Sequence, residues 1–431
     1  MTYTLNHFQT LCETYTTWPQ LKQFLESHAG GNIRIVESED SPGFAICRYV
    51  KGESDLRGPA GLFRSVVWDT VACRPVCFAP AKAAFGPPPL ATPLASIEEF
   101  VDGCMMQAFV TKADPTKLQI ATRTQLGGAN TFYGKKSFRD MFEECLAGTP
   151  IRTTEALLES MHGALGDADA VFASFVLQHP DHRVVAKIVS PDLHMIHLGT
   201  VAGDGSVAIN EQSAAWPVAL RRLQVARYPV REFADEAEIY DLMRRTAVQN
   251  GFRWQGLVFK DGAGKRWRLR STSYTMLRGL RGSEATTQER FLRLRKEGKV
   301  VEYLKHYGQE QSGGVDERAQ FWGLEQQLRK CTTAVYEAYN AVHKAHTLKF
   351  AQLPAAFQPA VHLMHVEYLT TLRPKKGNVQ LSVAIQIVNG LKTFEQKRLL
   401  AADLEAFSTL VAAAALTSLS TAAPAAAQSA E

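Results

Sequence analysis

The residues of this sequence that are best suited to a chemical task are basic, and they gather in one segment. Between Arg253 and Lys305 there are fourteen lysines and arginines against five acidic residues, whereas the whole chain of 431 residues carries a formal charge of only +5. Arginine and lysine bind phosphate groups, and arginine does so through two parallel hydrogen bonds. The segment is therefore a candidate surface for RNA, although a solvated basic helix face has the same composition.

A predicted β-hairpin opens this segment, with GLVFKD at 256–261 and RWRLRS at 266–271 on either side of the turn GAGK. Side chains alternate between the two faces of a strand. We therefore expect Arg268 and Arg270, which flank Leu269, to lie on one face and to reach the same anion. The candidate RNA-binding residues of the segment are Lys265, Arg266, Arg290, Arg293 and Lys296, the last three at helical spacing.

Turn residues and runs of β-branched and aromatic residues predict further strands upstream. The predicted strand pairs are 63–69 with 74–78, 101–110 with 118–124, and 175–178 with 183–189. Helical spacing of apolar residues predicts helices at 137–146, 154–165 and 236–249. Residues 1–280 are thus expected to form an α+β domain of largely antiparallel sheets with helices.

After Tyr274 the pattern becomes helical. Thr286 followed three residues later by Glu289 is a capping-box sequence, and residues 317–349 contain no proline and no strand alternation. We expect residues 281–418 to form a helical C-terminal domain, which offers a surface to a protein partner in a larger complex. Residues 419–431 are expected to be a disordered Ala-rich tail.

The strand blocks, taken in order, resemble the motifs of the RNA ligase family of the bacteriophage T4 RNA ligase 1 type. The blocks are FRSVVWD, EEFVDGCMM, FVLQHPDHRVV and QGLVFKDGAGKRWRLRSTSY. In the family they are an ARG-like strand, KxDG, FExxxPxNRIV, and EGxV with KxK, and a helical domain follows. Members join RNA ends through a covalent lysyl-AMP. The resemblance spans roughly residues 60–310 and implies a nucleotidyltransferase core, like that of ATP-grasp-like ligases.

The positions that carry catalysis in this family are replaced here. The residue that corresponds to the nucleophilic lysine is Phe100, and the two metal-supporting glutamates correspond to Val176 and Gln255. A phenyl ring has no lone pair with which to attack a phosphate, and neither valine nor glutamine offers a carboxylate to Mg²⁺. The resemblance thus implies a degenerate site with no catalytic residue, no metal ligands and no cofactor.

Other family positions keep groups that suit a phosphate. The nucleotide- or phosphate-binding positions that the resemblance implies are Asp102, Gly103, Arg64, Arg123, Arg268 and Arg270. Arginines at the two lysine positions of KxK preserve the positive charge and improve bidentate contact with phosphate. Loss of two carboxylates together with a divalent cation leaves the local charge nearly unchanged. This pattern favours a metal-free anion site.

The favoured interpretation is an RNA ligase-like pseudoenzyme that binds RNA or serves as a subunit of a larger complex. Two alternatives stay open. The first is an active ligase that uses ATP and Mg²⁺ with an atypical lysine, Lys112 or Lys82, although Lys112 lies in a predicted turn. The second is a purely structural scaffold that makes protein contacts through the helical domain.

Several classes of protein are disfavoured by composition. No run approaches the roughly 18 uncharged apolar residues of a membrane span, and the N-terminus lacks the layout of a signal peptide. The seven cysteines include no CxxC pair. The HxxH pairs have no third ligand nearby in sequence, so zinc is disfavoured; they are His194/His197, His343/His346 and His362/His365. We expect an intracellular protein, cytoplasmic or nuclear, that is not secreted and not bound to a membrane.

Overall fold

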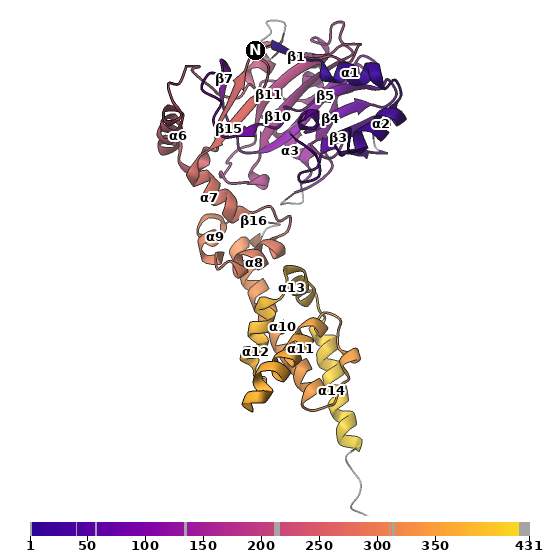
Figure 1. The fold of residues 1–431 in the computed structure, drawn as a ribbon, viewed down its shortest axis with the longest axis vertical. Helices are drawn as coiled ribbons and strands as arrows, with labels where there is room; N and C mark the ends of the chain where they lie inside the picture. Colours follow the sequence, from indigo (N-terminus) through magenta and orange to yellow (C-terminus); the bar gives the residue numbers. More distant parts are fainter. Residues whose placement is uncertain are drawn as a thin grey trace, which may run out of the picture. The chain divides into compact units, whose positions relative to one another are not determined.

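The computed structural model of the protein describes residues 2–39, 41–56, 58–132, 136–210, 216–309, 311–312 and 315–421. Contacts divide the chain into two compact units, Met1–Arg281 and Gly282–Glu431 (Figure 1). The division lies one residue from the boundary expected at 280/281. The expected disordered tail lies outside the described residues from position 422 onward.

The first unit is a mixed α+β fold with antiparallel sheets. Its largest sheet has six strands in the order β1-β12-β11-β10-β8-β9, all of them antiparallel. These strands are β1 (Thr2–Leu5), β8 (Cys104–Thr111), β9 (Gln119–Thr122), β10 (Ala170–Gln178), β11 (Asp192–Val201) and β12 (Val207–Asn210).

Two smaller sheets complete this unit. The five-stranded sheet has the order β13-β7-β14-β15-β6, with β15 and β6 parallel, and the four-stranded sheet has the order β2-β3-β4-β5. The five-stranded sheet contains β6 (Ala84–Phe85), β7 (Leu94–Glu99), β13 (Arg227–Tyr228), β14 (Gly256–Asp261) and β15 (Arg266–Arg270). The four-stranded sheet contains β2 (Ile33–Glu37), β3 (Phe44–Tyr49), β4 (Val66–Asp69) and β5 (Arg74–Phe78).

Helices cover these sheets through separate apolar cores. Met141 and Phe142 of α3 pack with Phe175 of β10, and Ile239 of α6 packs with Trp267 of β15. The helices of the unit are α1 (His7–Thr14), α2 (Trp18–Glu26), α3 (Phe138–Ala147), α4 (Thr154–His162), α5 (Val218–Arg222), α6 (Glu236–Asn250) and α7 (Thr272–Arg281). Short 3₁₀ turns are η1 (Pro59–Leu62), η2 (Pro180–His182) and η3 (Gly251–Arg253). The six-stranded and five-stranded sheets therefore each bury one face against a helix.

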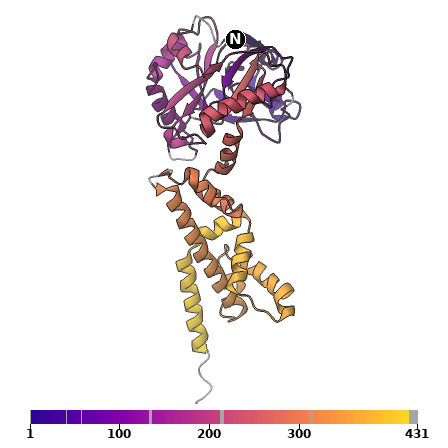
Figure 2. The same ribbon diagram turned by 90° about the vertical axis from the view of Figure 1, so that its left-hand side faces the viewer.

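The second unit is helical, with a two-stranded hairpin. Its long central helix α10 contacts α8, α11, α12, α13 and α14, and Figure 2 shows α14 running alongside it. The elements are α8 (Thr287–Lys296), α9 (Val300–Tyr307), β16 (Gln311–Ser312), β17 (Val315–Asp316), α10 (Glu317–His343), η4 (Phe350–Gln352), α11 (Gln358–Glu367), η5 (Tyr368–Leu372), η6 (Arg373–Lys375), α12 (Leu381–Gly390), α13 (Thr393–Leu400) and α14 (Leu404–Thr421). Thr286 caps α8, because its side chain accepts from the Glu289 N–H at 3.3 Å.

In the described part of the chain, no single helix is both long and apolar enough to cross a bilayer. Only α13 taken together with Leu404–Leu416 of α14 reaches the required length and composition, and that pair is bent by 74°.

The predicted hairpin between 175–178 and 183–189 is wrong. The strand β10 pairs instead with β11, which begins at Asp192. Residues 183–189 form no strand because the Val185 and Ala186 N–H groups donate to the Asp102 carboxylate rather than to a neighbouring strand. The other two predicted strand pairs, β4 with β5 and β8 with β9, and the β14–β15 hairpin are confirmed.

The strand expected at 101–110 begins only at Cys104. Residues 100–103 instead cross from β7 in the five-stranded sheet to β8 in the six-stranded sheet. At the end of this crossover the chain passes very close to β10. A Cβ atom added at Gly103 would lie 2.7 Å from Val176 Cγ1 and inside contact distance of the Leu177 carbonyl oxygen. Gly103 is therefore required by packing.

We predict that Gly103→Ala lowers the free energy of unfolding by about 1–3 kcal/mol, because the added methyl group overpacks the contact with β10. Chemical denaturation followed by circular dichroism measures the change. Gly279→Ala is the matched control: the residue is exposed in α7 with no atom within 4 Å of the added Cβ, so helix propensity raises stability by up to about 1 kcal/mol. Equal stability of Gly103→Ala and the parent protein would contradict the packing argument.

Candidate anion-binding site

The crossover between the two sheets is held by the buried side chain of Asp102. Its Oδ2 accepts hydrogen bonds from the Val185 and Ala186 N–H groups, both at 3.0 Å, and its Oδ1 accepts one from the Tyr274 hydroxyl at 2.6 Å. Burial, together with the Asp102 charge, raises the pKa of Tyr274. Asp102 was expected to bind nucleotide or phosphate. In the structure, both of its oxygens accept hydrogen bonds from within the fold.

Gly103 has a packing role. It was expected beside Asp102 as a phosphate-binding residue, but its lack of a side chain serves the close approach to Leu177. Val176, expected to replace a metal-supporting glutamate, packs in a small apolar cluster with Val101 and Val225. The surroundings of both positions are therefore those of a packed core.

The strand β15 carries three arginines on one face. Trp267 and Leu269 are buried on the opposite face, which leaves Arg266, Arg268 and Arg270 together. The guanidinium carbons of Arg268 and Arg270 lie 5.9 Å and 5.3 Å from the centre of the Phe100 ring. Both cations therefore stack around one aromatic ring, at distances typical of cation–π contacts.

Gln255 fixes one of these arginines. The amide is oriented so that both its oxygen and its nitrogen form hydrogen bonds. The oxygen accepts from Arg270 Nε at 2.9 Å and Nη2 at 3.1 Å, and the nitrogen donates to the Val101 carbonyl at 3.1 Å. Burial lowers the pKa of Arg270, and the neighbouring Arg268 lowers it further. The glutamine holds the guanidinium in place without neutralising its charge.

Arg64 lies next to Arg266. Arg64 Nη1 approaches the carbonyl oxygen of Pro80 at 3.5 Å, and Arg266 Nη1 donates to the next carbonyl, that of Ala81, at 3.2 Å. Burial lowers the pKa of Arg64 to about 10, and the positive charge of Arg266 contributes. These two residues join the pair on Phe100, and we call the set the inner arginine group: Arg64, Arg266, Arg268 and Arg270.

Charge compensation for the inner arginine group is incomplete. Among the described residues no carboxylate forms an ion pair with Arg64, Arg268 or Arg270. The Nε atom of Arg268 is buried and has no hydrogen-bond partner there. Guanidinium groups gathered in this way form a site for an anion.

A second set of arginines combines two residues of the four-stranded sheet, which the sequence did not single out, with Arg123, an expected phosphate-binding residue that follows β9. Arg34 of β2 and Arg48 of β3 are direct cross-strand partners, and the exposed Arg123 places its guanidinium carbon 6.0 Å from the Tyr49 ring. We call Arg34, Arg48 and Arg123 the outer arginine group. Alternation within IRIVE and FAICRY is the signal that would have identified these strands.

The basic residues predicted on α8 do not form one exposed surface. Arg290 is buried and paired with Glu317, whose other oxygen accepts from the Tyr303 hydroxyl at 2.6 Å. Arg293 is half-buried and pairs with Glu284 at 2.7 Å. Only Lys296 of the three is exposed. The expectation for Arg290 is therefore corrected, because its guanidinium has a partner inside the helical unit.

Lys265, the first residue of the predicted RNA-binding set, is exposed at the turn before β15. Its ammonium nitrogen lies 5.2 Å from the centre of the Trp267 ring. The structure therefore leaves this lysine, together with Lys296, accessible to a ligand.

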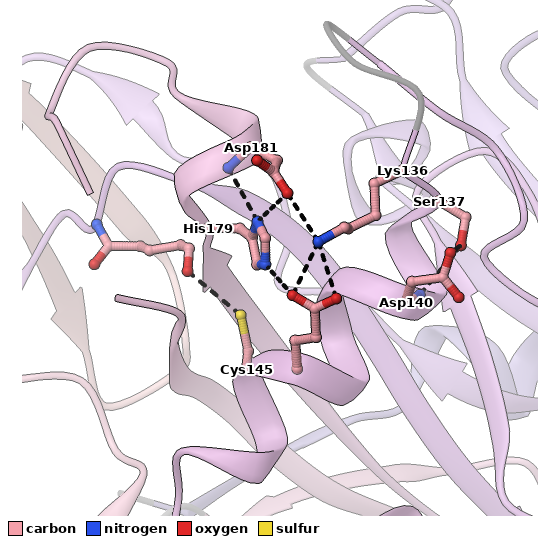
Figure 3. Close-up of polar contacts among 8 residues, drawn as sticks. Lys136, Ser137, Asp140, Cys145, His179 and Asp181 are labelled. Atoms are coloured by element: carbon pink, nitrogen blue, oxygen red, sulfur yellow. Dashed lines mark hydrogen bonds and ion pairs between the residues drawn. The ribbon is translucent and has the colours of Figure 1, made fainter. Parts of the chain in front are cut away.

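A polar network fixes the segment that leads to Val185 (Figure 3). The buried His179 accepts the Asp181 N–H at Nδ1 (3.1 Å), so its Nε2–H donates to Glu144 of α3 at 2.8 Å. Lys136 lies 2.9 Å from Glu144 Oε1 and 2.8 Å from Asp181 Oδ2. Hydrogen bonds from Lys136 and then His179 lower the pKa of Glu144, and Lys136 lowers the pKa of Asp181. The network ties η2 to α3.

Other features are less suited to a reaction. Over the described ranges no three His, Cys, Asp or Glu side chains are placed to hold a metal ion. A cavity of about 480 Å³ lies between the Pro-rich link at 88–94 and α6, lined in part by Phe233 and Ile239, and neither arginine group lines it.

The sequence was compared with known proteins. No family model matches it, and no curated protein proves to be a relative. Function is therefore inferred from the residues and their geometry.

We predict that Glu144→Gln flattens the acid limb of the stability curve. The folded-state pKa of Glu144 lies below its ordinary value of 4.5, so its contribution is present above pH 4.5 and is lost as pH falls through the folded-state value. At pH 7 the substitution should cost about 1 kcal/mol or less, because the carboxylate is largely exposed. Glu143→Gln removes the same charge from α3 without touching His179, and an equal cost there would contradict the role of the network.

Proposed function

We propose that the protein binds RNA through a core similar to that of T4-type RNA ligases, and that the inner arginine group holds an RNA phosphate without metal and without nucleotidyl transfer. One observation carries the proposal: Arg268 and Arg270 lie over the ring of Phe100, the residue at the position of the family nucleophile. Arg64 and Arg266 lie beside them, joined to consecutive carbonyl groups.

The electrostatics of the group support an anionic ligand. Four guanidinium groups repel one another, and burial of Arg64 and Arg270 adds a cost for each charge. A phosphate reduces that repulsion and accepts bidentate hydrogen bonds from the planar guanidinium groups. Arg268 forms no ion pair with a carboxylate of the described residues, so its charge is available to such a ligand. RNA is the partner that fits a mildly basic protein with this core.

The site lacks the nucleophile and the carboxylates that covalent nucleotidyl transfer requires. Phe100 offers no lone pair, and Val176 and Gln255 offer no carboxylate. The thiol of Cys104, next in the chain to the crossover, is a poor nucleophile, because burial raises its pKa to about 12. The active-ligase alternative would require Lys112, exposed in the turn after β8, or Lys82, exposed after Ala81.

We predict that incubation with α-labelled ATP and Mg²⁺ leaves no label on the denatured polypeptide. The control is Phe100→Lys combined with Val176→Glu and Gln255→Glu, which restores the family residues at three positions. Label on this variant would show that the surrounding geometry still accepts a nucleotide. Lysyl-AMP recovered from the parent protein and mapped by mass spectrometry to Lys82 or Lys112 would establish the active ligase instead.

We predict that Arg268→Gln lowers the affinity for a 5′-phosphorylated single-stranded RNA about tenfold, because one charge-assisted hydrogen bond to phosphate contributes roughly 1.5–3 kcal/mol. Fluorescence anisotropy at about 50–100 mM salt measures the dissociation constant. Arg245→Gln, on the exposed surface of α6, removes the same charge and should change affinity little. Failure of the parent protein to bind RNA under these conditions would contradict the proposal.

A second candidate function is a protein contact made by the helical unit. Leu363 and Val366 of α11 and Leu381 and Ile385 of α12 are 40–46% exposed, and these two helices contact each other. Exposed apolar side chains on neighbouring helices suit a protein partner. If no substitution in the inner arginine group changed the affinity for RNA, this scaffold function would be favoured over RNA binding.

A further inference from the structure

We infer that the outer arginine group, Arg34, Arg48 and Arg123, is a second phosphate-binding surface, which takes the backbone of the same single-stranded RNA that the inner arginine group holds at another phosphate. The inference rests on the proposed function above. It extends that function from the capture of one phosphate to the binding of a strand several nucleotides long.

The arrangement of Arg34 and Arg48 is unfavourable by itself. They face each other directly across the antiparallel strands β2 and β3, and like charges in directly opposite positions destabilise a sheet. Within the described chain neither residue forms an ion pair, and the buried Nε of Arg48 has no hydrogen-bond partner. Burial lowers the pKa of Arg48, and the positive charges of Arg123 and Arg34 lower it further. A bound anion would relieve this repulsion.

Contacts through Tyr49 link the segments that carry the outer and inner groups. Tyr49, the residue after Arg48, donates its N–H to the carbonyl oxygen of Phe63, the residue before Arg64, at 2.6 Å. Arg123 stacks against the ring of the same tyrosine. The charge of Arg123 contributes to the lowered pKa of both Arg48 and Arg64. Arg123 is therefore the member of the outer group that lies close enough to Arg64 for its charge to act on it, and a chain of phosphates can pass from one group to the other.

The chemistry of this surface suits a phosphodiester backbone better than an acidic peptide. Protein interfaces depend on large apolar or aromatic anchors at their centre. No residue of β2 or β3 in the described structure is an exposed large apolar side chain, so the surface has no large apolar anchor beside its three arginines. Binding of nucleic-acid backbones derives from such contacts and from counterion release.

The test compares Arg34→Gln/Arg48→Gln with the parent protein on two RNAs, one of about 3 and one of about 12 nucleotides, both carrying a 5′-phosphate. For the longer RNA we expect about a tenfold loss of affinity, and a log–log salt slope smaller by about 1.4, since each neutralised phosphate of a single strand contributes about 0.7. For the shorter RNA we expect no change. Arg268→Gln should weaken binding of both.

The control is Arg244→Gln/Arg245→Gln, which removes two charges from the exposed surface of α6 and should alter neither affinity nor slope. Thermal unfolding gives an independent readout: relief of like-charge repulsion means that Arg34→Gln/Arg48→Gln should melt no lower than the parent protein.

Three results would overturn the inference. An unchanged affinity and slope on the longer RNA, with Arg268→Gln still weakening binding, would refute the second surface while leaving the proposed function intact. If the parent protein bound neither RNA, both the second surface and the proposed function would be refuted. Displacement of the longer RNA by poly-glutamate at equal charge concentration would assign the surface to an acidic protein instead.

Discussion

The buried carboxylate of Asp102 is the constraint on which the arrangement of the first unit depends. It lies where the chain crosses between two sheets, and it is bound by the segment after η2 and by α7, 172 residues further along the chain. A buried charge is tolerated only when hydrogen bonds satisfy it, and here three donors do so. The carboxylate therefore fixes the crossover beside β10 and determines where Phe100 can lie.

The inner arginine group follows from that position. Phe100, two residues before Asp102, presents its ring to Arg268 and Arg270, and each cation–π contact offsets about 0.5–1 kcal/mol of the repulsion between them. Arginine tolerates such an environment better than lysine, because its charge is delocalised and more weakly hydrated. The inner arginine group therefore keeps its positive charges close together without a carboxylate paired to Arg64, Arg268 or Arg270 among the described residues.

Counting charges along the sequence overestimated the basic surface of the second unit. Arg290 and Arg295 are neutralised by Glu317 and Glu325, which lie 27 and 30 residues further along the chain. Lys260 in the first unit is likewise buried against Glu98. A local excess of basic residues therefore indicates an exposed cationic surface only where tertiary packing brings no carboxylate to it.

The amino-acid sequence by itself determined the local elements whose signals are short-range: the β14–β15 hairpin around GAGK, the shared face of Arg268 and Arg270, and the Thr286 cap of α8. Periodicity and capping act within a few residues, so they can be recognised without the fold. Tertiary structure alone decided that Val185 and Ala186 bind Asp102 while residues 183–189 form no strand, and that Arg34 and Arg48 face each other across β2 and β3. These contacts join segments far apart in the chain, and their energies depend on burial and on neighbours that no local pattern specifies.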